Sequence, residues 1–548
     1  MLLPLGVLLF SSFRDTAIKL PFEDTSFTLA NYAAVVTAPA TLRLLGNTAL
    51  YALGSIALGM LLGGAFAWFL TRVAVPGRSL LTACVLAAMA TPPFTDAIAW
   101  ALLASPSVGL LNAAIHALSG TTGEGPINIY SLGGMAFVTG LKSVPSAFIL
   151  LAGSVARFDP SLEEAALTHG STPWSTLRRV SLPLLRPAIV GALVLFIIFI
   201  LEFFEIPAVL GLPGRIFVFS TLIYDASHPP FGLPNYGLIS AYSSVFLAIS
   251  GVLLVVYNRA TAHNEQFAVV TGKGYRPRQV QLGFATYVLI GVVVLYAILA
   301  VVLPIMTLVW TSLGLAYAPA GVASLALANL NSYQFLLRDE KIHTAVTNTL
   351  VIAVVAGTCT MLLATAVAWL SARYRGPVAA TPDRLTLLGS ATPAILVGLA
   401  LLFFYAWLPL PIYGTIWIIV IGLSTRYMSY CTRVMSAAFL QLNRELEEAA
   451  WLSGAAWTST LRRVVAPLVW PAFAGGWLWV VVHAVRDAAL AVMLFTVAND
   501  TVGARIWSMW FSEARPGEAA ALAVCMALVT GCLSLGVIRT SMRMGQDL

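Results

Sequence analysis

Charged residues are scarce in this sequence. Asp, Glu, Lys and Arg make up 10% of its 548 residues, and hydrophobic residues make up 59%, whereas a soluble globular protein carries roughly 25% charged residues. Such a chain cannot stay disordered in water, because disordered segments are rich in charge and poor in large apolar side chains. The composition therefore predicts an integral membrane protein.

Cysteine is also scarce. The five cysteines all lie within apolar runs, and their odd number and their spacing exclude a disulfide scaffold and a metal site. We interpret them as small packing residues. They are Cys84, Cys359, Cys431, Cys525 and Cys532.

Catalytic motifs are absent as well. No Gly-x-x-x-x-Gly-Lys-Ser/Thr phosphate loop occurs, and the nearest approach, Gly272-Lys273-Gly274, lacks the upstream Gly and the following hydroxyl residue. The sequence also has no Gly-x-Ser-x-Gly elbow and no cluster of His and carboxylates with metal spacing. We therefore predict that the chain is not an enzyme, with no catalytic residue, no metal and no cofactor of its own.

Long hydrophobic runs are what the sequence does contain. A transmembrane helix needs about 20 apolar residues, and eleven such windows follow a short apolar opener at 1–13, which gives twelve segments of an all-α polytopic membrane protein. The windows are 44–70, 80–103, 133–156, 187–210, 238–257, 284–313, 345–370, 385–407, 412–438, 471–495 and 519–538.

The opener is too short to cross a hydrocarbon core of roughly 30 Å as a helix, and it lacks the basic start and cleavage site of a signal peptide. It aligns with residues 303–312, whose own span begins 19 residues earlier at Phe284. We expect an upstream in-frame start that adds about twenty apolar residues, or a truncated sequence. The alternative is a genuine half-span packed against the bundle.

The basic residues predict the topology. With the N-terminus inside, 18 of the 30 Lys and Arg residues lie in inside loops, eight in outside loops and four within spans. Cytoplasmic loops carry an excess of Lys and Arg in membrane proteins, so this orientation is expected. The positive charge is thereby explained without nucleic acid, which we do not expect as a partner.

The chain contains an internal repeat. Residues 162–187 align with 446–471 at an offset of 284, with 15 of 26 positions identical, whereas earlier pairs match at an offset of 301. The first half thus carries 17 extra residues, which we place in an outside loop within the polar stretch 105–131. Six spans separate the copies, so two parallel six-helix repeats are expected, with both loops in the cytoplasm. We predict domains at 1–258 and 284–548, joined by a basic cytoplasmic linker at 259–283.

Each copy of the repeated loop, 159–186 and 443–470, is predicted to form a short helix, a turn and a second helix. The paired alanines after each Glu-Glu present a small, flat surface that suits docking. Glycine permits the sharp turn, and proline marks where the chain stops before it re-enters the membrane. The residues are Asp159-Pro160 and Asn443 at the helix starts, Gly170 and Gly454 at the turns, and Pro183 and Pro467 at re-entry.

The motif EEAALTHG followed by STLRRVSLP, and its copy EEAAWLSG followed by STLRRVVAP, resembles the EAA loop of ABC-importer permeases. In that family a Gly and a Pro follow the Glu at the spacings found here, 170 − 164 = 6 and 183 − 164 = 19. Ala466 departs from the Leu that the family prefers before the Pro. The resemblance covers nearly the whole chain as two fused permease domains, and it implies that each loop couples to an ATPase. The coupling residues that it implies are Glu163, Glu164, Ala165, Ala166, Gly170, Pro183, Glu447, Glu448, Ala449, Ala450, Gly454 and Pro467.

The resemblance also implies the partners. Two ABC ATPase domains, expected as a homodimer, would bind ATP and Mg on the cytoplasmic face, and a substrate-binding protein would dock on the outer face. The chain would cross the lipid bilayer of a bacterial inner membrane many times. An ion-coupled secondary transporter with parallel repeats and a purely structural scaffold remain alternatives, although both treat the duplicated loop as a coincidence.

Charged residues inside the predicted spans form a second candidate site. A charge at the centre of a membrane helix costs roughly 2.5 to 3.5 kcal/mol on insertion scales, so these residues should pair with one another or line the pathway, and the sequence leaves both open. Glu202 and Arg486 occupy equivalent positions, and we predict that they pair and help close the pathway. The pathway or gate residues are Glu202, Glu205, Arg486, Asp487, Lys142 and Arg426, and Asp96 is a further intramembrane acid.

The stretch 201–226, LEFFEIPAVLGLPGRIFVFSTLIYDA, resembles fused permeases of the ferric-iron uptake group. This implies ferric iron as the solute, with thiamine, phosphonate or another small solute as alternatives. Carboxylates such as Glu202 and Glu205 suit a hard cation, whereas Lys142 and Arg426 suit an anion. The residues themselves leave the substrate open.

Overall fold

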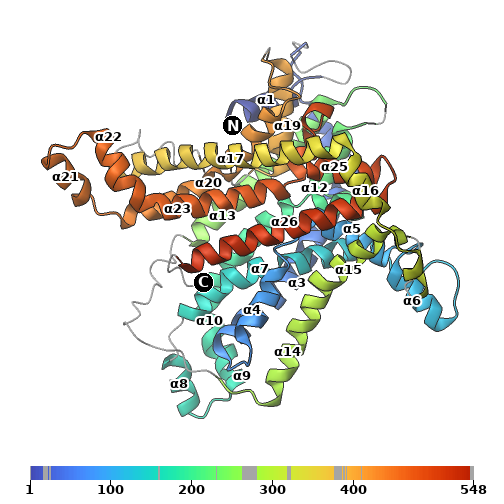
Figure 1. The fold of residues 1–548 in the computed structure, drawn as a ribbon, viewed down its shortest axis with the longest axis horizontal. Helices are drawn as coiled ribbons and strands as arrows, with labels where there is room; N and C mark the ends of the chain where they lie inside the picture. The colour runs from blue at the N-terminus through green and yellow to red at the C-terminus, as the bar shows by residue number, and fades with distance from the viewer. Residues whose placement is uncertain are drawn as a thin grey trace. The chain divides into compact units, whose positions relative to one another are not determined.

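The computed structural model describes residues 2–15, 22–23, 26–157, 161–229, 231–261, 280–316, 322–374, 386, 389, 392–408 and 410–543. These residues form helices joined by loops (Figure 1), and their only β pairing is two isolated bridges. The predicted all-α class is confirmed. The expected helix start at Asp159-Pro160, the Gly272-Lys273-Gly274 segment and residues 262–279 of the predicted linker lie outside the described residues.

The first half of the sequence alternates long apolar helices with short ones. Its helices are α1 (Leu2–Ser12), α2 (Ala30–Thr37), α3 (Pro39–Arg72), α4 (Arg78–Ala87), α5 (Pro93–Ala104), α6 (Leu110–Ser119), α7 (Leu132–Arg157), α8 (Ser161–Thr168), α9 (Pro173–Thr176), α10 (Leu182–Glu202), α11 (Glu205–Gly211), α12 (Phe219–Ser227) and α13 (Tyr236–Thr261).

The second half repeats much of this order. Its helices are α14 (Phe284–Ala297), α15 (Leu303–Trp310), α16 (Asn331–Arg338), α17 (Glu340–Arg373), α19 (Ala394–Trp407), α20 (Ile416–Gln441), α21 (Glu445–Leu452), α22 (Trp457–Thr460), α23 (Ala466–Arg486), α24 (Ala489–Met493), α25 (Val502–Phe511) and α26 (Pro516–Arg543).

The helix bounds confirm the duplication. Helices α3 and α17 both have 34 residues and begin 301 residues apart, at Pro39 and Glu340. Helices α7 and α20 both have 26 residues and begin 284 residues apart, at Leu132 and Ile416. The difference of 17 residues falls between α5 and α7, where the first half has α6, so the predicted place of the insertion is also confirmed.

Eight of the described helices are long and apolar enough to cross a membrane. The predicted window 80–103 instead forms α4 and α5, because Pro92 takes an extended conformation before Pro93. The windows 187–210 and 471–495 are also interrupted, since short breaks separate α10 from α11 and α23 from α24. The window 412–438 forms α20, which has 26 residues but carries Arg426 and Arg433 and is not among the eight. The described parts of 1–13 and 385–407 form the shorter helices α1 and α19.

The structure divides into two compact units, which are described separately. Unit 1 consists of Met1–Val36, Ile223–Leu247 and Leu330–Leu548, and unit 2 consists of Thr37–Leu222 and Ala248–Asn329. Within unit 1, α1 packs on α19; within unit 2, α14 packs on α4 and α15 packs on α5. The first helical segment of each half therefore lies in the unit that is built mainly from the other half: α1 lies in unit 1, and α14 and α15 lie in unit 2. The boundaries 1–258 and 284–548 stay a prediction about the repeat, and the compact units cut across them.

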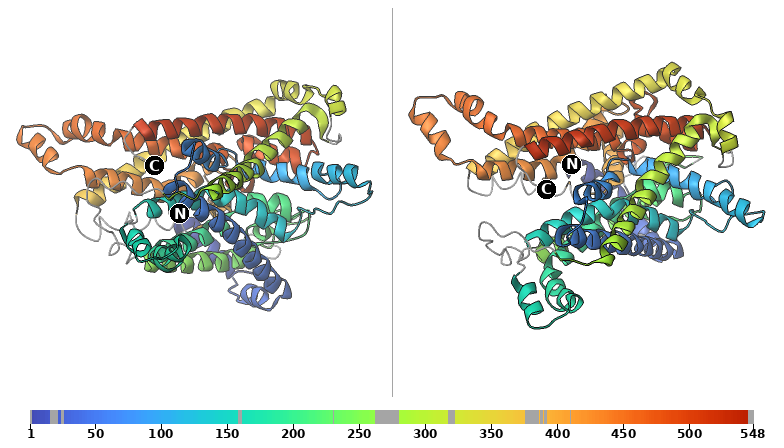
Figure 2. Two further views of the ribbon diagram at one scale, coloured as in Figure 1. Left: turned by 90° about the horizontal axis from the view of Figure 1, so that it is seen from below. Right: turned by 60° about the horizontal axis from the view of Figure 1, so that its bottom comes forward.

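Unit 1 has two distinct ends. The repeated loop, with α21 and α22, lies at one end of α17, α20 and α23, and α16 and α25 lie at the other (Figures 1 and 2). This is the arrangement that the predicted topology requires, because α21 belongs to an inside loop and α16 to an outside loop.

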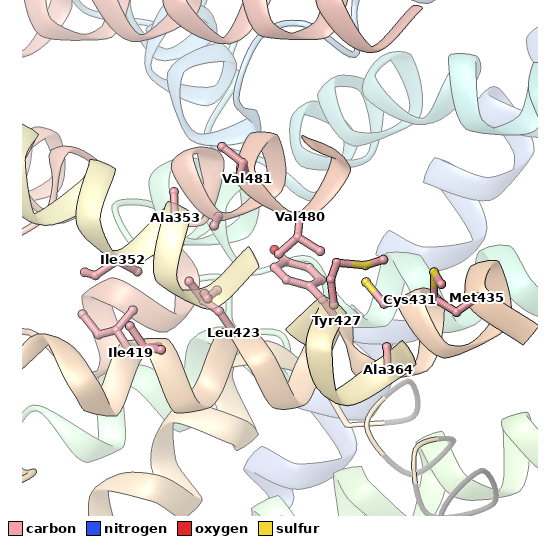
Figure 3. Packing of buried hydrophobic residues seen from close by; sticks show 14 of the residues in the cluster. Ile352, Ala353, Ala364, Ile419, Leu423, Tyr427, Cys431, Met435, Val480 and Val481 are labelled. Atoms are coloured by element: carbon pink, nitrogen blue, oxygen red, sulfur yellow. The ribbon is translucent and has the colours of Figure 1, made fainter. Parts of the chain in front are cut away.

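The core of unit 1 lies between α17, α20 and α23 (Figure 3). Ile352, Leu423, Met435 and Val480 are buried there together with Cys431. The predicted packing role therefore holds for Cys431. It is wrong for three others, because Cys359, Cys525 and Cys532 are exposed, and Cys84 is only partly buried.

Candidate functional sites: the repeated loop and the buried ion pairs

The repeated loop forms the predicted helix, turn and helix. Helices α8 and α21 have eight residues each, and a turn connects them to α9 and α22. The turn residues Gly170 and Gly454 have φ angles of 85° and 80°, a left-handed conformation that residues with a Cβ rarely adopt. A Cβ at either position would meet nothing within 4 Å. The backbone conformation, and not crowding, therefore requires glycine.

The start of the loop helix is visible in the second copy. The side-chain oxygen of Asn443 accepts a hydrogen bond from the backbone N–H of Glu445 at 3.3 Å. This bond satisfies one of the donors that the first turn of a helix leaves without an intrahelical partner. Asn443 therefore helps to start α21, as the sequence predicts.

The loop prolines do not end the helix, so the prediction that the chain stops at Pro183 and Pro467 is wrong. A π-helical turn at Leu177–Ser181 runs directly into α10, and one at Leu461–Val465 runs into α23. Proline lacks an N–H and its ring crowds the carbonyl four residues earlier. A wider turn relieves this crowding and lets the helix continue. Continuous helix thus joins each loop to the membrane helix that follows it.

The first glutamate of each motif turns back toward its own unit. Glu447 Oε1 forms an ion pair with Arg373 Nη2 at 2.6 Å and accepts a hydrogen bond from Arg373 Nε at 2.8 Å. Glu163 Oε2 lies 4.0 Å from Arg72 Nη1, and its Oε1 accepts a bond from Ser181 Oγ at 2.6 Å. We call these two pairs, Arg72–Glu163 and Arg373–Glu447, the inner clamps.

Neither clamp arginine was predicted from the sequence. They are the last residues of α3 and α17, outside the repeated loop itself. The repeat held the signal that could have found them, because 373 − 72 equals the offset of 301 that relates the early parts of the two halves.

The opposite side of the loop helix is open and largely apolar. In the second copy Ala449 is exposed, Trp451 is 41% exposed and Leu452 is 90% exposed. Glu448 also faces outward and forms an exposed pair with Arg444 at 3.2 Å. In the first copy Ala165 is exposed, and the side chain of Glu164 lies outside the described residues. The two glutamates of the second motif thus have opposite orientations.

A buried ion pair anchors Lys142 in unit 2. Its Nζ donates to Asp96 Oδ2 at 2.5 Å, to the carbonyls of Ala88 and Thr91 at 2.6 Å, and to Thr91 Oγ1 at 2.8 Å. Thr91 Oγ1 in turn donates to Asp96 Oδ2 at 2.9 Å. The pair therefore fastens the break between α4 and α5 to the middle of α7.

Arg426 is the equivalent base in unit 1, since 426 − 142 = 284. Its Nη1 donates to Asp487 Oδ2 at 2.6 Å. Asp487 lies in the break between α23 and α24, and its Oδ1 accepts a hydrogen bond from the N–H of Leu490, in the first turn of α24, at 2.9 Å. The position equivalent to Asp487 holds Phe203, and the position equivalent to Asp96 holds Val397. The base is thus shared by the halves, whereas its acid comes from different elements.

The remaining predicted pathway residues flank the same helix breaks. Glu202 ends α10, Glu205 begins α11, and Arg486 ends α23. Glu202 belongs to unit 2 and Arg486 to unit 1, and their pairing stays a prediction. For Lys142 and Arg426 the structure supports the pairing interpretation, which the sequence left open.

A third charged cluster, which the sequence did not predict, lies at the α25 end of unit 1. The buried Arg505 is 3.0 Å from Glu513 and 3.8 Å from Asp339. Asp500 is 6% exposed, and this burial raises its pKa to about 6 despite the lowering effect of Arg505. The sequence offered little signal, because Arg505 resembles any other base of an outside loop.

The chain is similar to known transport proteins. A family model described as the binding-protein-dependent transport system inner membrane component matches residues 364–541. Fe(3+)-transport system permease protein FbpB 2 of Haemophilus influenzae is 24% identical over 501 residues, which cover 90% of this chain and 89% of that protein.

Two relatives align with less of the chain at higher identity. Trehalose/maltose transport system permease protein MalF of Thermococcus litoralis is 30% identical over 42% of this chain and 77% of that protein. Sulfate transport system permease protein CysT of Escherichia coli is 31% identical over 42% of this chain and 79% of that protein. These relatives are transport components and not enzymes. The chain therefore belongs to the family of binding-protein-dependent inner membrane components, the permease subunits of ABC importers.

Proposed function

We propose that the chain is the transmembrane permease subunit of an ATP-driven importer, with two fused permease halves at 1–258 and 284–548. One observation carries the proposal: the chain has two loops of the same length and conformation, each on a continuous helix that leads into the membrane-spanning part. A secondary transporter has no use for such a pair of loops. A twofold-related pair of ATPases requires two docking points.

Each loop would dock one ATPase domain. The outward face of α21 suits a protein cleft, because it presents small and apolar side chains such as Ala449 and Leu452 to the surroundings. The coupling residues would be those of the two EAA motifs with their turn glycines and their prolines. The chain has no phosphate loop, so ATP and Mg would bind to the partner subunits, which we expect to be a homodimer.

The solute would be ferric iron, delivered by a binding protein on the outer face of a bacterial inner membrane. Residues 201–226 and the alignment with an Fe(3+)-transport permease over 90% of this chain support iron. The carboxylates of Glu202 and Glu205 lie at the break between α10 and α11 and are suitable groups for a hard cation. Sulfate and trehalose or maltose, named for the relatives that match less of the chain, are the competing solutes.

Reconstitution tests this function. The chain, an ATPase and a binding protein from the same organism are placed in proteoliposomes, with radioactive ferric iron, sulfate and trehalose offered separately. We expect ATP hydrolysis to depend on the chain and iron alone to accumulate. Uptake of sulfate or trehalose would exclude iron and keep the importer, whereas uptake driven by an ion gradient without ATP would exclude the importer itself.

A further inference from the structure

The inner clamps occur twice, at equivalent places. The arginines are related by the offset 373 − 72 = 301, and the glutamates by 447 − 163 = 284. The two members of each pair therefore come from parts of the repeat that the 17-residue insertion separates. Both halves nevertheless bring them together, so the pairing belongs to the repeated architecture and not to one local sequence.

The clamp side chains are enclosed. The side chains of Arg373 and Glu447 are 10% and 3% exposed, and those of Arg72 and Glu163 are 2% and 17% exposed. Arg373 Nη2 also reaches the carbonyl of Leu442 at 3.4 Å, just before α21. An enclosed carboxylate that already binds an arginine is poorly placed to bind a partner protein. These glutamates therefore act within the chain, whereas the exposed face of the same helix remains open for docking.

Each clamp connects the loop to the longest helix of its unit. Helices α3 and α17 have 34 residues, which at about 1.5 Å per residue corresponds to roughly 50 Å. Helix α17 packs along α20 and α23, and α3 packs along α7 and α10. A displacement of the loop reaches the following helix through the π turn and reaches the long helix through the clamp. Without the clamp, only the first of these connections remains.

We propose that Arg72 and Arg373 are positioning residues that transmit movement of the loops to α3 and α17 during transport. The proposal rests on the proposed function of the loops as ATPase docking points. A merely structural brace would lower stability, assembly and activity together. A transmitting contact is different, because its loss leaves ATPase binding intact and separates ATP hydrolysis from transport.

The experiment compares Arg373→Gln and Arg72→Gln, singly and together, with the wild-type chain in complex with its ATPase. Arg78→Gln is the matched control, because Arg78 is an exposed arginine at the start of α4, six residues after Arg72. The first readout is the number of ATP molecules hydrolysed per ferric iron imported. We expect at least a tenfold increase in the double variant, basal hydrolysis within about twofold of wild type, and no change in the control.

The second readout does not depend on the solute. Spin labels at Leu452 on α21 and at Leu362 on α17, both exposed in unit 1, report the distance from the loop to the long helix. In the wild-type complex this distance should stay constant when ATP and vanadate are added, because the clamp moves the two together. In Arg373→Gln it should change on addition of nucleotide. The charge-exchanged variant Arg373→Glu with Glu447→Arg should restore part of the wild-type behaviour.

Three results would overturn the proposal. Unchanged coupling and an unchanged label distance in the double variant would show that the clamp transmits nothing. Failure of the neutral variants to bind the ATPase, or a proportional loss of hydrolysis and uptake, would make the clamp a brace. Absence of ATPase binding by the wild-type chain would instead reject the proposed function, and the clamp proposal with it.

Discussion

At the scale of single residues, the two halves carry a base at the same position of the repeat. The acid that pairs with this base lies at a different position in each half. Lys142 and Arg426 are equivalent, but their acids stand on α5 and in the break between α23 and α24. A buried charge without a partner is strongly unfavourable, so a base at this position requires an acid nearby. The repeated backbone offers more than one place for that acid.

The Lys142–Asp96 pair should dominate the local stability of unit 2. The two side chains are 6% and 5% exposed, and removal of one partner of such a pair costs about 3–5 kcal/mol. We expect Lys142→Met and Asp96→Asn each to lower the free energy of unfolding by this amount, and the double variant to lose less than the sum. Urea unfolding in detergent measures the cycle.

The exposed pair Arg444–Glu448 is the control for this cycle, because a surface pair contributes about 0–1 kcal/mol. Strictly additive effects of the two buried substitutions would mean that the ion pair contributes nothing as a pair.

Asp500 should make unit 1 less stable as the pH rises. Its pKa is raised from 3.8 to about 6 in the folded chain, so the folded state binds a proton that the unfolded state has already lost. The contribution of Asp500 to the free energy of unfolding is therefore most favourable below about pH 4. It becomes less favourable between about pH 4 and pH 6, where the folded state loses this proton. We expect Asp500→Asn to melt at a higher temperature than wild type at pH 7.5 and at the same temperature at pH 4. An equal difference at both values would contradict the titration.

At the scale of elements, the loop depends on backbone conformation more than on contacts. Gly170 and Gly454 turn the chain in the left-handed region with open space around them, and the π turns let the helix pass Pro183 and Pro467. Both features set the direction of a helix that has few neighbours to hold it. Small local changes should therefore alter coupling more than global stability.

Gly454→Val should weaken association of the ATPase with the loop, and Gly454→Asn should not. A β-branched residue in the left-handed region costs roughly 1–2 kcal/mol, whereas Asn visits this region routinely. In the reconstituted complex we expect ATPase association to fall for Val and to remain for Asn, with similar melting temperatures for both. Equal behaviour of the two variants would mean that the turn conformation is unimportant, since the space at Gly454 accepts either side chain.

At the scale of the whole molecule, the halves of the sequence are not independent folding units. Unit 1 includes the opening segment of the chain, and unit 2 includes α14 and α15 from the second half. A single half therefore lacks a helix that its main unit needs, and it would leave apolar surface without its native contacts.

Separate expression of residues 1–258 and 284–548 tests this dependence. We expect neither half to be monodisperse alone and both to copurify when they are produced together, because each completes a unit of the other. Affinity purification through a tag on one half, followed by size-exclusion chromatography, measures copurification and monodispersity. A stable, monodisperse half on its own would contradict the exchange of segments.

Features that depend on a local pattern could be predicted from the amino-acid sequence. Apolar windows gave the membrane class and the positions of most spans, and the two offsets gave the duplication and the place of the insertion at α6. The turn glycines followed from conformational preference, since only glycine enters the left-handed region at little cost. These signals lie within a few residues of the features that they predict.

Which charges meet, and which segments share a unit, could be seen only in the folded chain. Arg373 and Glu447 are 74 residues apart and Arg426 and Asp487 are 61 apart, and no periodicity links such positions. The acids of the two membrane pairs break the symmetry of the repeat, so the repeat could not predict them. The sequence also did not predict that the helix continues through Pro467, because a wider turn compensates for the N–H that proline lacks. Such features follow from how long helices pack side by side, and packing is fixed by contacts between residues far apart in the chain.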